Sequence, residues 1–175
     1  MMNREIGSEF WINKNNIYNR KSEFPHWLKK FGNVVLTSSG RGAINLILEH
    51  VNPIIKKVLL PSYICDSVIL PFERAGYEIN YYDVDEYFRP ININAENIEE
   101  GIFLHMGYFG FPTNSELKNT ISKLRANSVI IIEDVTHTLF SKYENYTCND
   151  FVVGSIRKWI GIPSGGFLAS KEIIN

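Results

Sequence analysis

The sequence is poor in cysteine, has no long apolar run and carries almost no net charge. Its two cysteines, Cys65 and Cys148, form neither a Cys-x-x-Cys pair nor a zinc spacing with histidine, so neither a disulfide framework nor a metal site is indicated. The 18 Lys and Arg residues balance 19 Asp and Glu residues and are scattered along the chain. This distribution lacks the basic stripe that nucleic-acid binding requires, and we expect no nucleic-acid partner.

The longest apolar run, residues 129–132, is far too short to span a bilayer. The N-terminal residues Met-Met-Asn-Arg-Glu also lack the apolar core of a secretory signal. We therefore expect a cytoplasmic protein with no membrane partner. The length of 175 residues and the hydrophobic content of 45% fit one ordinary domain with a sizeable core.

Short apolar segments alternate with helical patterns along most of the chain. The pattern predicts strands over residues 34–36, 58–60, 77–84, 102–106, 128–132, 151–153 and 166–169. It predicts helices over residues 43–51, 64–75 and 114–126, with a kink or break at Pro71. Such alternation is typical of an α/β fold in which helices cover both faces of a mostly parallel sheet.

Two segments make up the predicted domain organisation. Residues 1–31 are polar but contain scattered aromatic side chains, which predicts an N-terminal arm that packs on another surface. Residues 32–175 then form the α/β domain. In such a sheet, ligands bind outside the carboxyl ends of the strands. Asp134, His105 and the Pro61-Ser62 pair fall at those ends, and we expect them near a ligand.

Residues 39–43, Ser-Gly-Arg-Gly-Ala, open a predicted helix directly after a strand. Free backbone N–H groups at a helix start, aided by the helix dipole, can hold a phosphate. From these residues alone, a turn that simply needs glycine explains the pattern equally well. A dinucleotide fingerprint needs a third glycine where Asn45 stands, so dinucleotide binding is disfavoured.

Glu133 and Asp134 directly follow the strand predicted over residues 128–132, and Lys158 lies 24 residues beyond Asp134. Pyridoxal phosphate needs a carboxylate that keeps its ring nitrogen protonated and an amine that forms a Schiff base with its aldehyde. Taken alone, Asp134 could be a turn or cap residue, and Lys158 could be a solvated lysine. The neighbours Trp159, Ile160 and Ile162 favour the cofactor interpretation, because apolar surroundings favour the uncharged amine.

Several segments, taken together, resemble one protein family. They are residues 7–11, 39–44, 58–63, 105–112 and 133–137, together with residues 155–158 and the pair Gly165 and Gly166. In that order they are similar to the N-terminal segment, the phosphate turn, the Pro-x-Tyr strand end, the His-x-x-Gly-x-Pro stretch, the Glu-Asp-Ala-Ala-His/Gln block and the lysine region of the DegT/DnrJ/EryC1/StrS sugar aminotransferases. These are pyridoxal phosphate enzymes of fold type I.

The resemblance implies three residues near the reacting part of the cofactor. Lys158 would form the Schiff base and then move protons. Asp134 would pair with the pyridinium nitrogen. His137 would lie near the ring hydroxyl.

Four further cofactor-binding residues follow from the same resemblance. Backbone groups of Gly40 and Arg41, with Ser155, would hold the phosphate, although Arg41 replaces the usual threonine and removes its hydroxyl. Cys65 stands where many relatives place an aromatic residue that stacks on the ring.

The resemblance also implies a homodimeric aminotransferase that moves an amino group, from glutamate as the donor, to a nucleotide-linked keto sugar. Such a reaction would serve amino-sugar synthesis for surface polysaccharides or related glycans. Family members continue past the Gly-Gly strand into a smaller C-terminal domain, so we expect this chain to be an incomplete large domain. Two alternatives stay open: another fold type I enzyme, such as a dehydratase or desulfurase, and a truncated, inactive remnant or binding module.

Overall fold

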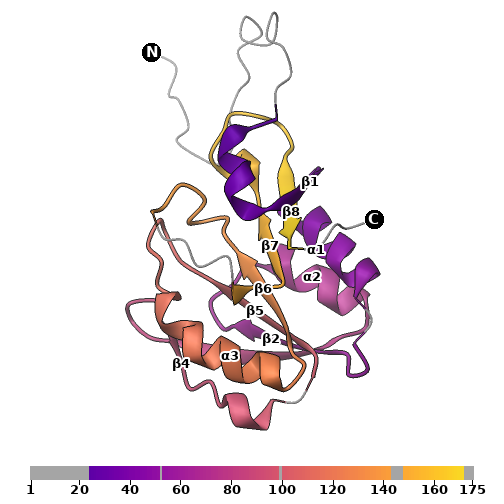
Figure 1. Ribbon diagram of the computed structural model, residues 1–175, viewed down its shortest axis with the longest axis vertical. Coiled ribbons are helices and arrows are strands. Elements are labelled where there is room, and N and C mark those ends of the chain that lie inside the picture. The colour runs from indigo at the N-terminus through magenta and orange to yellow at the C-terminus, as the bar shows by residue number, and fades with distance from the viewer. Residues whose placement is uncertain (1–23, 52, 99, 143–147, 172–175) are drawn as a thin grey trace, which may run out of the picture.

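The computed structural model describes residues 24–51, 53–98, 100–142 and 148–171. Within these ranges, eight strands form one sheet in the order β1-β8-β7-β6-β5-β2-β3-β4 (Figure 1). The strands are β1 (Asn33–Thr37), β2 (Lys57–Pro61), β3 (Glu78–Val84), β4 (Pro90–Ile91), β5 (Ile102–Met106), β6 (Ile130–Asp134), β7 (Phe151–Gly154) and β8 (Gly166–Ser170). The helices are α1 (Gly40–His50), α2 (Asp66–Arg74) and α3 (Lys118–Ala126), with short 3-10 helices at His26–Phe31, Ala95–Asn97, Ser115–Leu117 and Ile156–Lys158. No helix in the described ranges is long and apolar enough to cross a membrane.

The centre of the sheet is parallel. Strands β3, β2, β5, β6 and β7 run in one direction, which brings the carboxyl ends of β2, β5, β6 and β7 to one edge. Antiparallel pairs occur where β8 lies between β1 and β7 and where β4 joins β3. The predicted α/β architecture with a mostly parallel sheet is confirmed, whereas the two-residue strand β4 was missed because it is too short to show a period.

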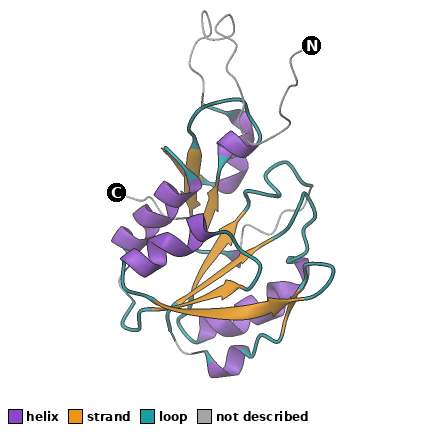
Figure 2. Cartoon of the chain, turned by 180° about the vertical axis from the view of Figure 1, so that it is seen from behind, coloured by secondary structure: helices purple, strands orange, loops and turns teal. Residues whose placement is uncertain are grey.

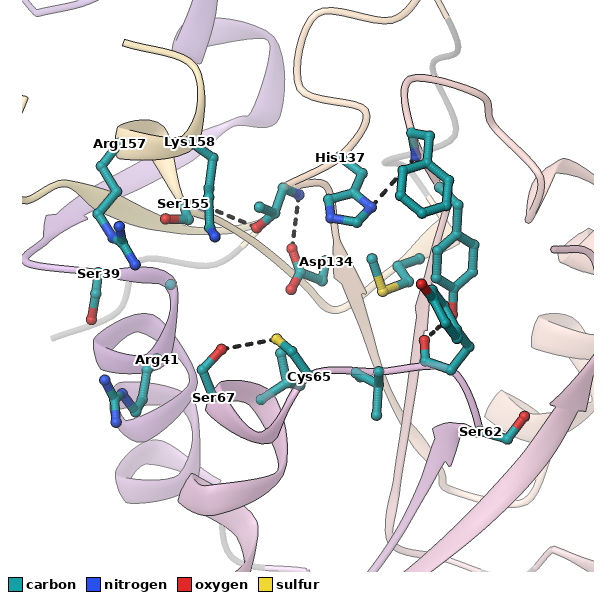
Figure 3. Close-up of a pocket in the computed structure, with 18 residues that line it drawn as sticks. Ser39, Arg41, Ser62, Cys65, Ser67, Asp134, His137, Ser155, Arg157 and Lys158 are labelled. Carbon is teal, nitrogen blue, oxygen red and sulfur yellow. Dashed lines mark hydrogen bonds between the residues drawn. The ribbon is translucent and has the colours of Figure 1, made fainter. Parts of the chain in front are cut away.

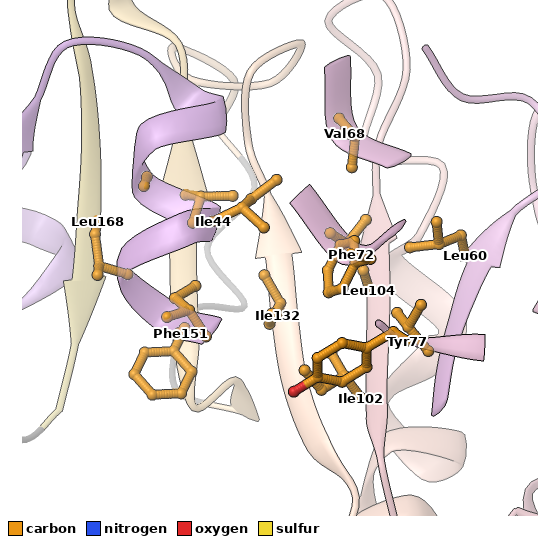
Figure 4. Packing of buried hydrophobic residues seen from close by; sticks show 14 residues of the cluster. Ile44, Leu60, Val68, Phe72, Tyr77, Ile102, Leu104, Ile132, Phe151 and Leu168 are labelled. Atoms are coloured by element: carbon orange, nitrogen blue, oxygen red, sulfur yellow. The ribbon is translucent and has the colours of Figure 1, made fainter. Parts of the chain in front are cut away.

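Helices α1 and α2 cover one face of the sheet (Figure 2). Their apolar residues, such as Ile44 and Phe72, pack on Ile102, Leu104 and Ile132 from the central strands (Figure 4). Ile102 and Leu104 lie two residues apart on β5 and so face the same side. Removing this surface from water is the main force that holds α1 and α2 against the sheet.

The opposite face is covered by α3 and by the 3-10 helix His26–Phe31. Ile121 of α3 packs near Phe103 of β5, and Phe31 lies 5.1 Å from Phe167 of β8 between ring centroids. Helices therefore cover both faces, as predicted. The described end of the predicted arm, residues 24–31, packs on the sheet, and residues 1–23 lie outside the described residues.

Two helix predictions are partly wrong. Helix α2 runs through Pro71 without a break, because Val68 and Phe72 are buried beside it and their packing stabilises the helix against one lost hydrogen bond. The helix predicted over residues 114–126 begins instead as the separate turn Ser115–Leu117 before α3. Asn114 provides no side-chain cap there: its Nδ2 donates to a buried network described below, and its buried Oδ1 accepts no hydrogen bond from the described residues.

Candidate active site

A cavity of about 480 Å³ opens at the carboxyl edge of the parallel strands, beside the start of α1 (Figure 3). It is bounded by the segments that follow β2, β5, β6 and β7, which is where a parallel sheet presents its ligand sites. The seven residues that the resemblance singled out all line it. They are Gly40, Arg41, Cys65, Asp134, His137, Ser155 and Lys158.

The start of α1 forms a seat with free hydrogen-bond donors. Ser39 caps the helix, and its hydroxyl oxygen accepts a hydrogen bond from the N–H of Gly42 at 3.1 Å. Within the described residues, the N–H groups of Gly40 and Arg41 have no hydrogen-bond partner, as expected for the first turn of a helix. Gly166 allows β8 to approach this turn, because a Cβ there would lie 2.6 Å from both the Ser39 carbonyl oxygen and the Gly40 nitrogen. The turn therefore faces the cavity with donors suited to an anion.

Asp134 is a buried carboxylate at the end of β6, and it is 6% exposed. Its Oδ1 accepts a hydrogen bond from the N–H of Thr136 at 2.8 Å. Burial raises the pKa of Asp134, while hydrogen bonds from the Thr136 side chain and backbone and the charge of protonated His137 act in the opposite direction. Among the described residues, no cationic side chain forms an ion pair with it. A cationic ligand group would therefore relieve a buried, uncompensated charge.

His137 lies beside Asp134 in the view of Figure 3 and packs on the loop after β5. Its Nδ1 accepts a hydrogen bond from the N–H of Phe109 at 3.4 Å, and the two rings stack with centroids 5.3 Å apart. The pKa of His137 is lowered overall. Burial is the largest cause and the charge of Lys158 acts in the same direction, whereas the negative charge of Asp134 raises the pKa. The imidazole is therefore uncharged at neutral pH, and its Nε2–H remains as a donor.

Lys158 ends the 3-10 helix that follows β7 and extends into the cavity toward Asp134 (Figure 3). The expected apolar enclosure is wrong, because Lys158 is exposed and Trp159 and Ile160 are themselves 40% and 38% exposed. The indole N–H of Trp159 donates to the carbonyl oxygen of Thr136, which holds the ring beside that residue. The amine is thus accessible to a ligand that enters from solvent.

Ser155, Cys65 and Arg41 border the cavity in different ways. Ser155 is 9% exposed, and its hydroxyl has no hydrogen-bond partner among the described residues. Cys65 is exposed at the start of α2, with its Sγ 2.9 Å from the hydroxyl oxygen of Ser67. The Arg41 side chain is exposed and extends away along α1 (Figure 3), so its contribution to the turn is its backbone N–H.

The sequence interpretation missed several residues that line the cavity. Tyr108 and Phe109 form an aromatic wall with Tyr63, and the phenol O–H of Tyr108 donates to the Tyr63 carbonyl oxygen at 2.7 Å. In the sequence, only the aromatic residues within 105–112 indicated such a wall. Nothing in the sequence distinguishes Arg157 from an ordinary exposed arginine.

His105 does not line this cavity, which corrects the sequence expectation. It precedes Met106 at the end of β5, so its side chain faces the other side of the sheet. There its Nε2 lies 2.9 Å from the Asn149 amide oxygen, and its Nδ1 accepts from the Asn114 amide at 2.8 Å. Both amides donate to Glu133, at 2.6 and 3.0 Å. These four side chains form a closed, buried ring with a structural role.

No protein-family model matches the sequence, and no curated protein matches it. Solved structures do match. GDP-4-keto-6-deoxymannose-3-dehydratase (ColD), in a structure of a mutant with bound GDP-perosamine, is 18% identical with a TM-score of 0.67, and the match covers 83% of this chain and 42% of ColD. A lysine-to-alanine variant of serine palmitoyltransferase from S. paucimobilis, with a bound PLP-myriocin aldimine, is 17% identical with a TM-score of 0.62, and the match covers 83% of this chain and 41% of that one. SepCysS, in complex with the N-terminal domain of SepCysE, is 17% identical with a TM-score of 0.61, covering 79% and 42%.

These structures share the fold of this chain, which confirms the predicted fold type I architecture. This chain spans less than half of the length of each of them. At such low identity the likeness concerns the fold alone, and only the residues that line the cavity bear on its chemistry.

Proposed function

We propose that this chain is the cofactor-binding region of a pyridoxal phosphate enzyme that transfers an amino group to a nucleotide-linked keto sugar. The observation that carries the proposal is the convergence of Lys158, Asp134 and the start of α1 on one cavity. An amine, a buried carboxylate with no cationic partner and a phosphate seat are the groups that this cofactor requires. The serine palmitoyltransferase structure, which contains bound PLP, supports the same cofactor.

Each residue has a separate task in this proposal. Lys158 would bind the cofactor aldehyde and afterwards accept and donate protons with its amine. Asp134 would hold a proton on the ring nitrogen, and His137 would donate its Nε2–H to the ring hydroxyl. The free N–H groups of α1 and the Ser155 hydroxyl would hold the phosphate. When bound, pyridoxal phosphate supplies an aldehyde that exchanges amino groups and a ring that accepts electrons.

The substrate class is supported by two observations. The motif segments resemble sugar aminotransferases, and the ColD structure contains a nucleotide-linked sugar, GDP-perosamine. Glutamate as the donor, a homodimer and a smaller second domain belong to the same proposal and come from the resemblance. The open side of the cavity, where Lys158 is exposed, would face that substrate.

The cofactor part is tested by adding pyridoxal phosphate to the purified protein and recording the visible absorption spectrum. We expect a new band in the wild-type protein that is absent in Lys158→Ala. Lys171→Ala is the matched control, because Lys171 is exposed and does not line the cavity. A band of equal strength in Lys158→Ala would contradict the assignment.

Dehydration of a nucleotide-linked keto sugar is the second candidate, and the ColD comparison favours it. The two reactions are separated by incubating the cofactor-loaded protein with glutamate and a nucleotide-linked keto sugar. Mass spectrometry would show nitrogen in the sugar product for an aminotransferase. A product that has lost a hydroxyl and gained no nitrogen would identify a dehydratase.

A further inference from the structure

Arg157 lines the cavity and has no task in the proposed function. It is the middle residue of the 3-10 helix Ile156–Lys158, between Ser155 and the lysine. In Figure 3 its guanidinium extends in the direction of Ser39 at the start of α1, whereas Lys158 extends toward Asp134. The two adjacent cations therefore serve different parts of the same cavity.

Backbone hydrogen bonds tie Arg157 to the start of α1. Its N–H donates to the carbonyl oxygen of Gly165 at 3.3 Å, and the N–H of Gly165 donates to the carbonyl oxygen of Ser38 at 2.8 Å. Gly166, the next residue, packs directly on Ser39 and Gly40. These contacts fix the backbone of Arg157 relative to the phosphate seat.

The guanidinium has no partner within the described part of the chain. Arg157 is half-buried, yet it forms no hydrogen bond through its side chain and no ion pair there. Among the described residues, the cationic side chains that extend into the cavity are those of Arg157 and Lys158, against the single carboxylate of Asp134. This excess of positive charge is suited to a ligand that brings negative charge.

An independent observation points to the same anion. The Ser155 hydroxyl is nine-tenths buried and has no partner in the described residues, and it lines the cavity next to Arg157. With the N–H groups of Gly40 and Arg41, it forms a set of donors around one place. A phosphate monoester offers three strong acceptor oxygens and close to two negative charges, which matches these donors and one guanidinium.

We propose that Arg157 binds the phosphate of the cofactor and makes the site selective for a phosphorylated aldehyde over its unphosphorylated form. This inference rests on the proposed function. The outward direction of the Arg41 side chain leaves the turn without the hydroxyl that a threonine would provide there, and Arg157 supplies a different side-chain donor from across the cavity.

The test compares the affinities of pyridoxal phosphate and pyridoxal for wild-type protein, Arg157→Gln and Arg157→Lys by absorption titration. We expect Arg157→Gln to weaken the binding of pyridoxal phosphate roughly 10- to 100-fold, because charge-assisted hydrogen bonds to the phosphate are lost. The affinity for pyridoxal should stay unchanged. Arg157→Lys keeps the charge without the fork of donors, so its affinity for pyridoxal phosphate should lie between those of the wild-type protein and Arg157→Gln. Inorganic phosphate should compete with pyridoxal phosphate in the wild-type protein and less in Arg157→Gln.

Arg74→Gln is the matched control, because it removes the same charge from an exposed position at the end of α2. Circular dichroism establishes that each variant is folded. If pyridoxal phosphate binds the wild-type protein, the inference is overturned when Arg157→Gln binds both aldehydes equally more weakly, or binds both as tightly as the wild-type protein does. If neither aldehyde binds the wild-type protein, the proposed function is wrong and this inference falls with it.

Discussion

Replacing Gly166 by alanine tests whether the close contact between β8 and α1 builds the phosphate seat. The new Cβ would lie 2.6 Å from the Ser39 carbonyl oxygen and the Gly40 nitrogen. Ordinary contacts between heavy atoms are about 3.5 Å, so backbone on one side has to move by about 1 Å. Neither neighbour is the flexible end of a side chain, and the strain therefore cannot be relieved by a change of rotamer.

Overpacking of this kind costs about 1–3 kcal/mol, and we expect the upper end here because both contacts are with backbone atoms. About 3 kcal/mol lowers Tm by roughly 6–12 °C in a protein of this size. A shift of about 1 Å in a binding geometry can cost up to roughly 100-fold in function. We therefore expect Gly166→Ala to lose thermal stability and pyridoxal phosphate affinity together.

Gly42→Ala is a matched control at the same turn. Its Cβ would lie 3.4 Å from the Ser38 hydroxyl oxygen and 3.5 Å from that of Ser39, which leaves room for a methyl group. Alanine at a helical position is roughly 0.5–1 kcal/mol better than glycine, so Tm should rise. Thermal unfolding by circular dichroism and cofactor titration measure both effects. The reasoning is refuted if Gly166→Ala matches the wild-type protein in both measurements, or if Gly42→Ala is equally destabilised.

Borohydride reduction of the cofactor-loaded protein, followed by peptide mapping, should place the pyridoxyl group on Lys158, because its amine is accessible and faces Asp134; a label on Lys171 would contradict this. Asp134→Asn should lower the rate of amino transfer on the order of 100-fold or more, because a neutral amide cannot hold the cofactor ring nitrogen protonated. Because burial raises the pKa of Asp134, stability of the cofactor-free protein should fall as pH rises from about 3.8, and Asp134→Asn should remove that fall in urea titrations at several pH values. Burial lowers the pKa of His137, so below about pH 6.5 the unfolded chain takes up the proton more readily than the folded protein, and this contribution to stability is lost as pH falls. An unchanged pH profile of stability in His137→Gln would refute that contribution.

Local patterns in the sequence determined the main elements of the fold. The apolar runs at β2, β5, β6 and β7 and the helical spacing in α1 predicted the parallel centre and its covering helices. Such patterns are short and repeat with the period of their own element, so each can be recognised without knowledge of its partners. The turn before α1 and the carboxylate at the end of β6 were identified for the same reason.

Only the tertiary structure decided which side chains meet. His105 and Met106 are neighbours on β5, yet one joins a buried polar ring and the other lines the cavity, because adjacent residues of a strand face opposite sides. The indole of Trp159 finds its hydrogen-bond acceptor at Thr136, 23 residues earlier in the chain. The position of Arg157 beside the start of α1 depends on antiparallel β8, which carries Gly166 to Ser39. These contacts join segments that are distant in the chain, and no local period in the sequence encodes them.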